Sequence, residues 1–326
     1  MYNVASLFCG CGGVDLGTIG GFTFNQINYT KHPCKLVYAC DIDPKAIDTH
    51  KLNFNTEKLM CADICEVHAD DIPECDILTG GFPCQSFSTV NPTKNPFDDR
   101  ANLYKQMVRI IKAKQPKIFV AENVKGMMTL HKGTIFKQII SSFEEVGYKA
   151  FYSLLNAADY GVPQKRERVI IVGIRNDLWE KHGDFIFPAK TNEGDWQPLS
   201  VAVQKLAIED KKYYFSERAV QGMKNAKNNM KRGLAQNLNE PCLTVTSHFA
   251  KVSLNSRDPV LLVDPEKELY RRFTPLEAAR IQSFPDNFKF AGTDTTAYKQ
   301  IGNAIPPVIF WHITDKIIKY LERANS

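Results

Sequence analysis

A single thiol stands in an unusual setting in the first third of the chain. Cys84 lies in the stretch GGFPCQSFS (80–88), behind a proline and ahead of a polar segment. A carboxyl group, Glu122, follows within AENV, and two guanidinium groups, Arg166 and Arg168, follow within QKRERV. A reactive thiol beside a carboxyl group and fixed cations can perform nucleophilic catalysis assisted by proton transfer. Each group also has an ordinary explanation, as a buried cysteine, a strand-end ion pair or a surface basic cluster.

Glycines and acids at earlier strand ends indicate a nucleotide site. The sequence FCGCGG begins at Phe8 and ends at Gly13, and such a strand-to-helix turn presents backbone N–H groups to a ligand. Asp41 ends the next expected strand, where an acid suits the hydroxyls of a ribose. Asp63 follows a third strand and suits an adenine amino group. The last glycine of a dinucleotide motif is displaced to Gly17, so an adenosine ligand fits better than NAD.

These groups are expected at one edge of a mostly parallel sheet, where Arg166 and Arg168 stand at the start of the last strand and the other groups follow the carboxyl ends of earlier strands. Short apolar runs alternate with helix-period segments through the first half of the chain, which is typical of an α/β fold. Helices are expected at 104–114, 134–146 and 308–324, and TPLE (274–277) is a capping box that begins another short helix. The expected strands are Val4–Phe8, Lys35–Ile42, Leu59–Ile64, Cys75–Gly80, Lys117–Asn123, Ala150–Leu155 and Arg168–Ile174.

Composition is that of a globular chain with a mild basic excess. The 326 residues are 44% hydrophobic and 24% charged, with a net charge of +5. No apolar run approaches the roughly 18 residues of a membrane span, and the N-terminus lacks the features of a signal peptide, so we expect a cytoplasmic protein. Its cysteines are then expected to be reduced thiols, and their spacing predicts no metal site. The basic excess falls at 201–259, which indicates either a polyanion-binding face or a solvated surface.

An ordered set of motifs resembles that of the C5-cytosine DNA methyltransferases of bacterial restriction-modification systems. The motifs are FCGCGG, ADI, GGFPCQSFS, AENV, QKRERV, RRFTPLEAARIQSFPD and YKQIGNAIPP, and they span Phe8 to Pro307. The sequence departs from the family's pattern at Cys9 and Cys11 and at Asp41, where Glu is common. The resemblance implies a Rossmann-like S-adenosylmethionine-dependent fold with a second, smaller target-recognition domain. It implies that the cofactor contacts Phe8, Cys11, Gly12, Gly13, Asp41, Ile42, Asp63, Ile64, Pro83, Leu103 and Asn303.

The resemblance also implies a chemical mechanism. Cys84 would add to carbon 6 of cytosine and so make carbon 5 nucleophilic toward a methyl group. Glu122 would act at ring N3, Arg168 would hold O2, and Arg166 would support them near the DNA backbone. Because a stacked base is inaccessible, the cytosine must be rotated out of the duplex, and segment 86–102 is expected to close behind it.

A division of labour along the chain follows from the same resemblance. Residues 1–187, completed by 298–326, are expected to form the catalytic domain, 188–272 the target-recognition domain, and 273–297 a supporting segment. Double-stranded DNA is the expected partner, bound by a monomer, and a restriction endonuclease acting on the same site is a further candidate partner. The residues expected to contact DNA are Gln85, Ser86, Ser88, Lys227, Lys231, Arg232, Thr244 and Thr246.

Two other functions share these features. A tRNA cytosine methyltransferase would carry the same catalytic motifs, although PCLT (241–244) is only a loose echo of that subfamily's Cys-Phe-Thr signature. A catalytically silent DNA-binding relative would keep the fold, but intact Cys84, Glu122 and Arg168 argue against it.

Overall fold

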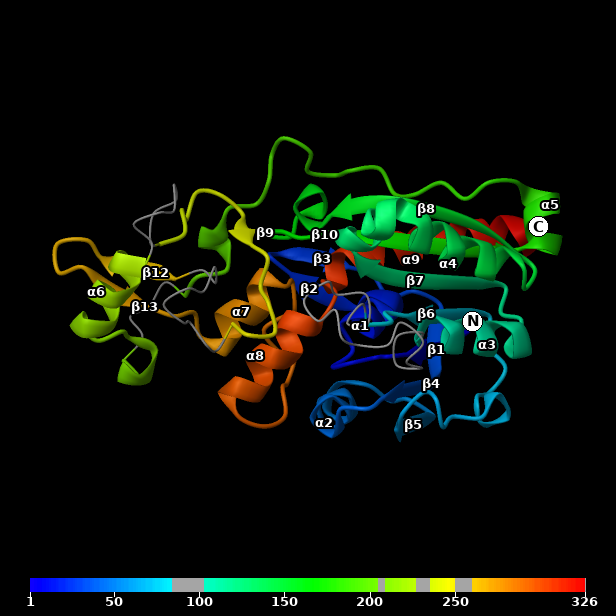
Figure 1. Ribbon diagram of the computed structural model, residues 1–326, viewed down its shortest axis with the longest axis horizontal. Helices are drawn as coiled ribbons and strands as arrows, with labels where there is room; N and C mark the ends of the chain where they lie inside the picture. The colour runs from blue at the N-terminus through cyan, green and yellow to red at the C-terminus, as the bar shows by residue number, and fades with distance from the viewer. Residues whose placement is uncertain (84–102, 205–208, 227–234, 250–259, 326) are drawn as a thin grey trace.

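The centre of the molecule is a seven-stranded sheet with the strand order β5-β4-β1-β6-β7-β10-β8 (Figure 1). The computed structural model describes residues 1–83, 103–204, 209–226, 235–249 and 260–325. Neighbouring strands from β5 to β7 are parallel, whereas β10 is antiparallel to both β7 and β8. The strands are β1 (Tyr2–Leu7), β4 (Cys34–Asp41), β5 (Lys58–Cys61), β6 (Ile77–Gly80), β7 (Ile118–Val124), β8 (Tyr148–Asn156) and β10 (Glu167–Arg175). Every strand predicted from an apolar run is therefore present, and the predicted α/β fold is confirmed.

Both faces of this sheet are buried, which explains its near-continuous apolar strands. In β7, Ile118 and Val120 point into one hydrophobic cluster, whereas Phe119 and Ala121 point into another. Helices α1 and α9 cover the first face, and α3 and α4 cover the second (Figure 1). The three predicted long helices are confirmed with ends shifted by one or two residues. The bounds are α1 (Gly13–Ile19), α3 (Leu103–Lys114), α4 (Thr134–Glu144) and α9 (Pro307–Asn325).

Smaller elements extend the molecule away from the sheet. Helix α6 and the hairpin β12–β13 lie at one end in Figure 1, with α7 and α8 between them and the sheet. Helix α6 and the β12–β13 region share a small core of Val220, Met223, Val260 and Tyr270. The remaining elements are β2 (Phe22–Phe24), β3 (Ile27–Tyr29), α2 (Pro44–Asn53), β9 (Gln164–Lys165), α5 (Asn176–His182), α6 (Glu217–Ala226), β11 (Cys242–Leu243), β12 (Leu261–Asp264), β13 (Leu269–Arg271), α7 (Pro275–Ile281) and α8 (Asp294–Asn303).

Helix α7 begins with the capping box expected from TPLE. The Glu277 N–H donates to Thr274 Oγ1 at 3.2 Å, and the Thr274 N–H donates to Glu277 Oε2 at 2.9 Å. A third hydrophobic cluster then joins this helix to the first half of the chain, because Cys11, Cys242, Ile281 and Ile301 pack together. No helix among the described residues is long and apolar enough to cross a bilayer.

Candidate active site

A large cavity opens at the carboxyl ends of strands β1, β4, β6 and β7. Its volume is about 1100 Å³, which is just above the upper end of the roughly 300–1,000 Å³ of pockets that bind one small ligand. The cavity is therefore large for one small ligand. The predicted cofactor- and base-contacting residues in its lining are Phe8, Cys11, Gly13, Asp41, Ile42, Asp63, Ile64, Pro83, Leu103, Glu122, Arg166, Arg168 and Asn303.

Asp41 holds the glycine-rich loop in place. The Gly10 N–H donates to Asp41 Oδ2 at 2.8 Å, and the Asp43 N–H donates to Asp41 Oδ1 at 2.9 Å. Burial raises the pKa of the Asp41 carboxyl, and these two N–H groups act in the opposite direction. Each oxygen keeps a lone pair that can accept a ligand hydroxyl. The sequence predicted a ligand contact at Asp41, and the structure adds this link to the loop.

The glycines of the loop have different reasons to lack a side chain. A Cβ on Gly12 would lie 2.2 Å from the Phe54 ring, and one on Gly13 would lie 2.4 Å from the carbonyl oxygen of Ile305. These two glycines let the loop pack against α2 and against the segment before α9, and Gly12 is not among the cavity-lining residues. A Cβ on Gly10 would meet no described atom within 4 Å. Gly10 is therefore where the loop backbone faces open space.

The end of the cavity lined by Ile42 and Asp63, where we predicted adenosine contacts, combines an apolar surface with acceptors. Ile42 is 66% exposed, which is unusual for isoleucine directly after a buried strand. Asp63 accepts a hydrogen bond from the Cys65 N–H at 2.9 Å through Oδ1. Asp43, on the cavity wall, accepts from Lys299 Nζ at 2.8 Å and so links the end of β4 to α8. A flat heterocycle could pack on Ile42 while Asp63 accepts from its amino group.

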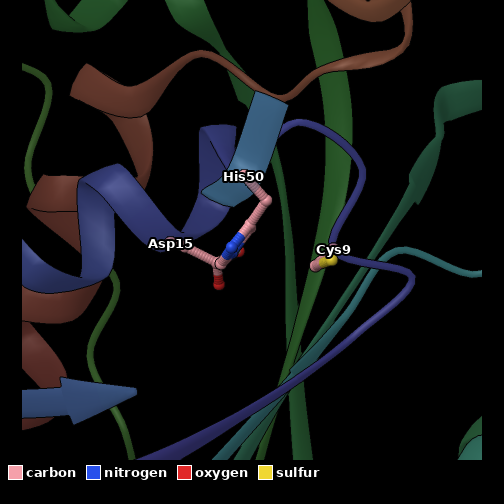
Figure 2. A group of neighbouring side chains, drawn as sticks. All are labelled: Cys9, Asp15 and His50. Carbon is pink, nitrogen blue, oxygen red and sulfur yellow. The ribbon is translucent and has the colours of Figure 1, made fainter. Parts of the chain in front are cut away.

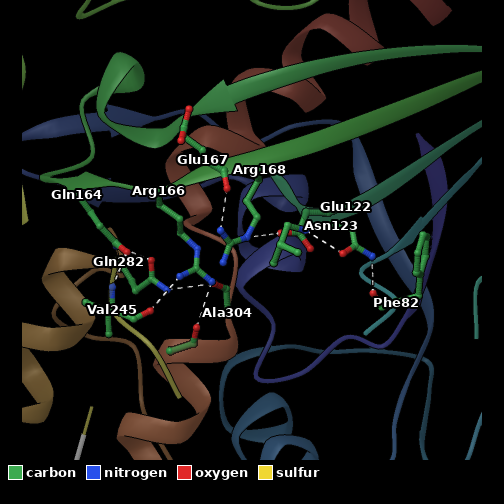
Figure 3. A network of polar contacts seen from close by, with 12 residues as sticks. Phe82, Glu122, Asn123, Gln164, Arg166, Glu167, Arg168, Val245, Gln282 and Ala304 are labelled. Atoms are coloured by element: carbon green, nitrogen blue, oxygen red, sulfur yellow. Dashed lines mark hydrogen bonds and ion pairs between the residues drawn. The ribbon is translucent and has the colours of Figure 1, made fainter. Parts of the chain in front are cut away.

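The other end of the cavity holds a nearly buried ion pair (Figure 3). Arg168 Nε lies 2.8 Å from Glu122 Oε1, and the two side chains are 15% and 13% exposed. Both come from the register of β10 against β7, in which Arg168 faces Val124 and Ile170 faces Glu122. The Arg168 Nη1 also donates to the carbonyl oxygen of Glu167 at 2.8 Å. The guanidinium is thus held in place while Glu122 remains on the cavity wall.

Asn123 is a site residue that the sequence reasoning missed. Its Nδ2 donates to the carbonyl oxygen of Phe82 at 2.8 Å, and its Oδ1 accepts from the Val124 N–H at 2.8 Å. Asn123 thereby ties β7 to the chain immediately before Pro83, which lines the cavity (Figure 3). Its place beside Glu122 in AENV was the available signal. The predicted nucleophile Cys84 and the predicted DNA contacts Gln85, Ser86 and Ser88 lie outside the described residues.

Arg166 joins distant parts of the chain. It is 2% exposed, and its guanidinium donates to the carbonyl oxygens of Val245, Gly302 and Ala304 at 2.9–3.1 Å (Figure 3). Burial lowers the pKa of Arg166 well below its usual value, and the neighbouring positive charge of Arg168 adds to this effect. Its geometry is that of a tether behind the cavity, which positions the Arg168 strand against α8.

A buried amide pair reinforces this tether. Gln164 Nε2 donates to Gln282 Oε1 at 2.7 Å, and Gln164 Oε1 accepts from the Val245 N–H at 2.9 Å. Gln282 Nε2 donates to the carbonyl oxygens of Ile301 and Ala304 at 2.7 and 3.0 Å. The sequence reasoning gave no role to either glutamine. Their places inside QKRERV and RRFTPLEAARIQSFPD were the available signal.

The predicted DNA contacts in the second half fall into two groups. Thr244 Oγ1 donates to the Lys165 carbonyl oxygen at 2.7 Å, so its hydroxyl fixes the backbone beside β9. Thr246 is exposed and its Oγ1 accepts from the His248 N–H at 3.3 Å. The basic candidates lie outside the described residues and are Lys227, Lys231 and Arg232.

One buried cluster holds side chains of the metal-binding types (Figure 2). Cys9, Asp15 and His50 offer ligand atoms within 4.8 Å of one another, and His50 Nε2 lies 3.1 Å from Asp15 Oδ2. Sequence spacing had predicted no metal site and did not foresee this cluster. Burial raises the pKa of the Cys9 thiol well above its usual value, and the charge of Asp15 acts in the same direction. We interpret the group as a hydrogen-bonded His50–Asp15 pair beside the Cys9 thiol, beneath the glycine loop.

A mostly parallel sheet with a cavity at its strand ends is typical of Rossmann-like folds, and the overall arrangement here matches that of S-adenosylmethionine-dependent methyltransferases. Solved structures share it across almost the whole chain. The Schizosaccharomyces pombe Dnmt2 methyltransferase has a TM-score of 0.75 at 18% identity and covers 100% of both chains. The Entamoeba histolytica methyltransferase EhMeth has a TM-score of 0.74 at 18% identity, over 98% of both chains.

Sequence relatives identify the family within that class. Residues 2–319 match the model of the C-5 cytosine-specific DNA methylases, and the chain belongs to that family as a DNA cytosine-5-methyltransferase. It is 34% identical to the Type II methyltransferase M1.ScrFI of Lactococcus lactis subsp. cremoris, over 100% of this chain and 80% of the relative. It is 35% identical to M.NgoFVII of Neisseria gonorrhoeae, over 93% and 83% of the two chains. These relatives are methyltransferases of restriction-modification systems.

Proposed function

We propose that the enzyme transfers a methyl group from S-adenosylmethionine to carbon 5 of a flipped-out cytosine in a specific short sequence of duplex DNA. The transfer proceeds through a covalent adduct between Cys84 and carbon 6 of the base. The observation that carries the proposal is the Glu122–Arg168 pair at 2.8 Å in the same cavity as Asp41 and the open face of Gly10. One cavity thus offers groups for a pyrimidine and groups for an adenosine.

The residues of the chain divide the chemistry between them. The Cys84 thiolate adds to carbon 6 and pushes electron density to carbon 5, while Glu122, protonated when the base is bound, donates a hydrogen bond or its proton to N3. Arg168 donates to O2 and is oriented by Glu122 itself. Bound S-adenosylmethionine supplies an electrophilic methyl group to carbon 5. Water then takes the carbon 5 proton, Cys84 departs as thiolate, and N3 returns its proton to Glu122, which restores the aromatic ring. Arg166, with its partners on the backbone, acts by positioning this wall.

The cavity fits the cofactor on its own chemistry. Asp41 keeps acceptor capacity for ribose hydroxyls, and the exposed face of Ile42 offers an apolar surface for adenine. Asp63 keeps one carboxylate oxygen for the exocyclic amino group, because its bond from the Cys65 N–H uses only Oδ1. Gly10 leaves room for the methionine portion at the positive end of α1.

The proposal extends to the division of the chain. Residues 1–187 with 298–326 form the catalytic domain, 188–272 select the DNA site, and 273–297 support the selector. The packing of α9 against α1 and β1 supports joining the last segment to the first. The enzyme acts as a monomer in the cytoplasm on duplex DNA, with a restriction endonuclease of the same specificity as its counterpart. Segment 86–102 closes on the rotated base.

The test uses wild type and Cys84→Ser. We expect wild type to incorporate labelled methyl groups into duplex DNA and not into tRNA, and bisulfite sequencing of plasmid from expressing cells to reveal the methylated word. A duplex with 5-fluorocytosine at that position should form an adduct that survives denaturation, because fluorine cannot leave as a cation. Cys84→Ser should form no adduct and transfer no methyl group, while it still binds cofactor and DNA. Substantial turnover by the serine variant would refute the covalent mechanism.

A further inference from the structure

A second cleft opens beside the active-site cavity, and its lining is cationic. We call it the side cleft and define it by Lys125, Asn156, Lys165, Glu167, Arg168 and Thr244. Arg168 also lines the active-site cavity, as do Val124 and Gly126, so the two hollows share a wall. Lys125 and Lys165 face Glu167 here, and Glu122 already offsets the charge of Arg168 on the shared wall, which leaves a formal excess of one positive charge.

The two lysines of the side cleft are held by weak, exposed interactions, unlike Arg168. Lys125 Nζ lies 3.0 Å from both carboxylate oxygens of Glu167, and the two side chains are 56% and 44% exposed. Lys165 Nζ lies 3.9 Å from Glu240 and sits 5.2 Å from the centre of the Trp196 ring. Exposed ion pairs contribute little and exchange readily for another anion. The Lys125–Glu167 pair can therefore open when a stronger anion arrives.

The backbone of the side cleft is fixed even though its ion pairs are loose. Thr244 donates to the Lys165 carbonyl oxygen at 2.7 Å, and the register of β10 between β7 and β8 sets the positions of Glu167 and Arg168. The lysines are therefore anchored at their α-carbons while their ammonium groups can turn. Fixed backbone with mobile ammonium groups suits an anion that belongs to a larger ligand, whose position is set by another contact of that ligand nearby.

We propose that the side cleft binds a backbone phosphate of the DNA strand that carries the target cytosine, with Lys125 and Lys165 as its cations. The inference rests on the proposed function, because it places the base against Glu122 and Arg168 on the shared wall. Glu167 occupies the anion position in free enzyme and is exchanged for phosphate on binding. It thereby weakens binding to all DNA and favours release of duplex that makes no further contact.

The test compares salt dependence among variants of the full-length enzyme. The ligand is a duplex containing the methylation site, with an unrelated duplex beside it. Removal of one phosphate contact lowers the slope of log K against log salt by about 0.9, which is about eightfold in affinity at 0.1 M salt. We expect Lys125→Gln and Lys165→Gln each to show this decrease on both duplexes. Glu167→Gln should bind both duplexes more tightly than wild type.

Glu144→Gln is the matched control for Glu167→Gln. It removes the same charge from an exposed pair, Glu144–Lys149 at 3.6 Å, at the opposite end of β8 from Asn156. It should leave DNA affinity unchanged. Two further duplexes each carry one neutral methylphosphonate linkage, on the 5′ or the 3′ side of the target cytosine. The one that lacks the phosphate bound by the side cleft should bind wild type and Lys125→Gln equally, because Lys125 then has no phosphate to contact.

Three results would overturn the inference. They are an unchanged salt slope in Lys125→Gln, equal affinities of Glu167→Gln and Glu144→Gln, and methylphosphonate duplexes that both still bind wild type more tightly than Lys125→Gln. Each would leave wild-type methylation of duplex DNA and the 5-fluorocytosine adduct intact. Failure of the proposed function would instead show in wild type, as absence of that methylation and that adduct.

Discussion

The joint between β13 and α7 depends on a buried ion pair whose loss should be costly. Arg271 donates from Nη1 and Nη2 to the two carboxylate oxygens of Glu277, both at 2.7 Å, and the side chains are 5% and 0% exposed. Glu277 also accepts from the N–H groups of Thr274 and Gln204, each at 2.9 Å. Glu277→Ala leaves Arg271 buried without a counterion, so we expect a loss of about 3–5 kcal/mol in the free energy of unfolding.

Two further variants separate burial from mere loss of an ion pair. Asp286→Ala removes the ion pair of Asp286 with Arg280, a residue of α7 like Glu277. This pair is also 2.7 Å long, but the Asp286 side chain is 61% exposed. It should cost less than about 1 kcal/mol. The double variant Arg271→Met with Glu277→Leu removes both buried charges together. It should lose less stability than Glu277→Ala alone, since no unpaired charge remains.

Urea unfolding followed by circular dichroism and tryptophan fluorescence measures these differences. We also expect Glu277→Ala to raise the KM for DNA more than the KM for S-adenosylmethionine, because the joint lies between the sheet and the α6–β13 region. If Glu277→Ala were no less stable than Asp286→Ala, the buried pair would contribute no more than a surface one. If the double variant were the least stable, the argument from an unpaired charge would be wrong.

Three further predictions follow from other parts of the molecule. Asp41→Ala and Asp63→Ala should each weaken S-adenosylmethionine binding, measured by calorimetry, far more than DNA binding. Unchanged cofactor affinity in both variants would mean that adenosine does not bind at this end of the cavity. Burial lowers the pKa of His312 to about 4, whereas an unfolded histidine titrates near about 6.5. Stability should therefore fall by up to about 3 kcal/mol as the pH drops from about 6.5 to 4, and His312→Gln should lack this part of the pH dependence in urea unfolding. Neutralising Lys227, Lys231 and Arg232 together should weaken binding to all DNA and lower the salt slope by about one unit for each phosphate contact removed. An unaltered slope would count against a role of these residues in docking.

Much of the fold could be predicted because its signals are local. Apolar runs found all seven strands, helix-period segments found α3, α4 and α9, and TPLE fixed the start of α7. Parallel strands brought Asp41, Asp63 and Glu122 to one cavity, and the antiparallel strand β10 brings Arg168 there near its start. The second half was harder, because short strands such as β9 and β11 have too few residues to show a period.

The sequence by itself determined the family, the sheet and the residue types at its carboxyl edge, because side-chain chemistry and apolar alternation are written residue by residue. Only the tertiary structure decided how those residues are held. Arg166 bonds to three backbone carbonyls, Asn123 to a fourth, and Asp41 to backbone N–H groups. Backbone groups are the same at nearly every position, so no pattern of residue types reveals which of them a side chain will meet. The shared wall at Arg168 likewise arises from strands that meet only after the chain has folded.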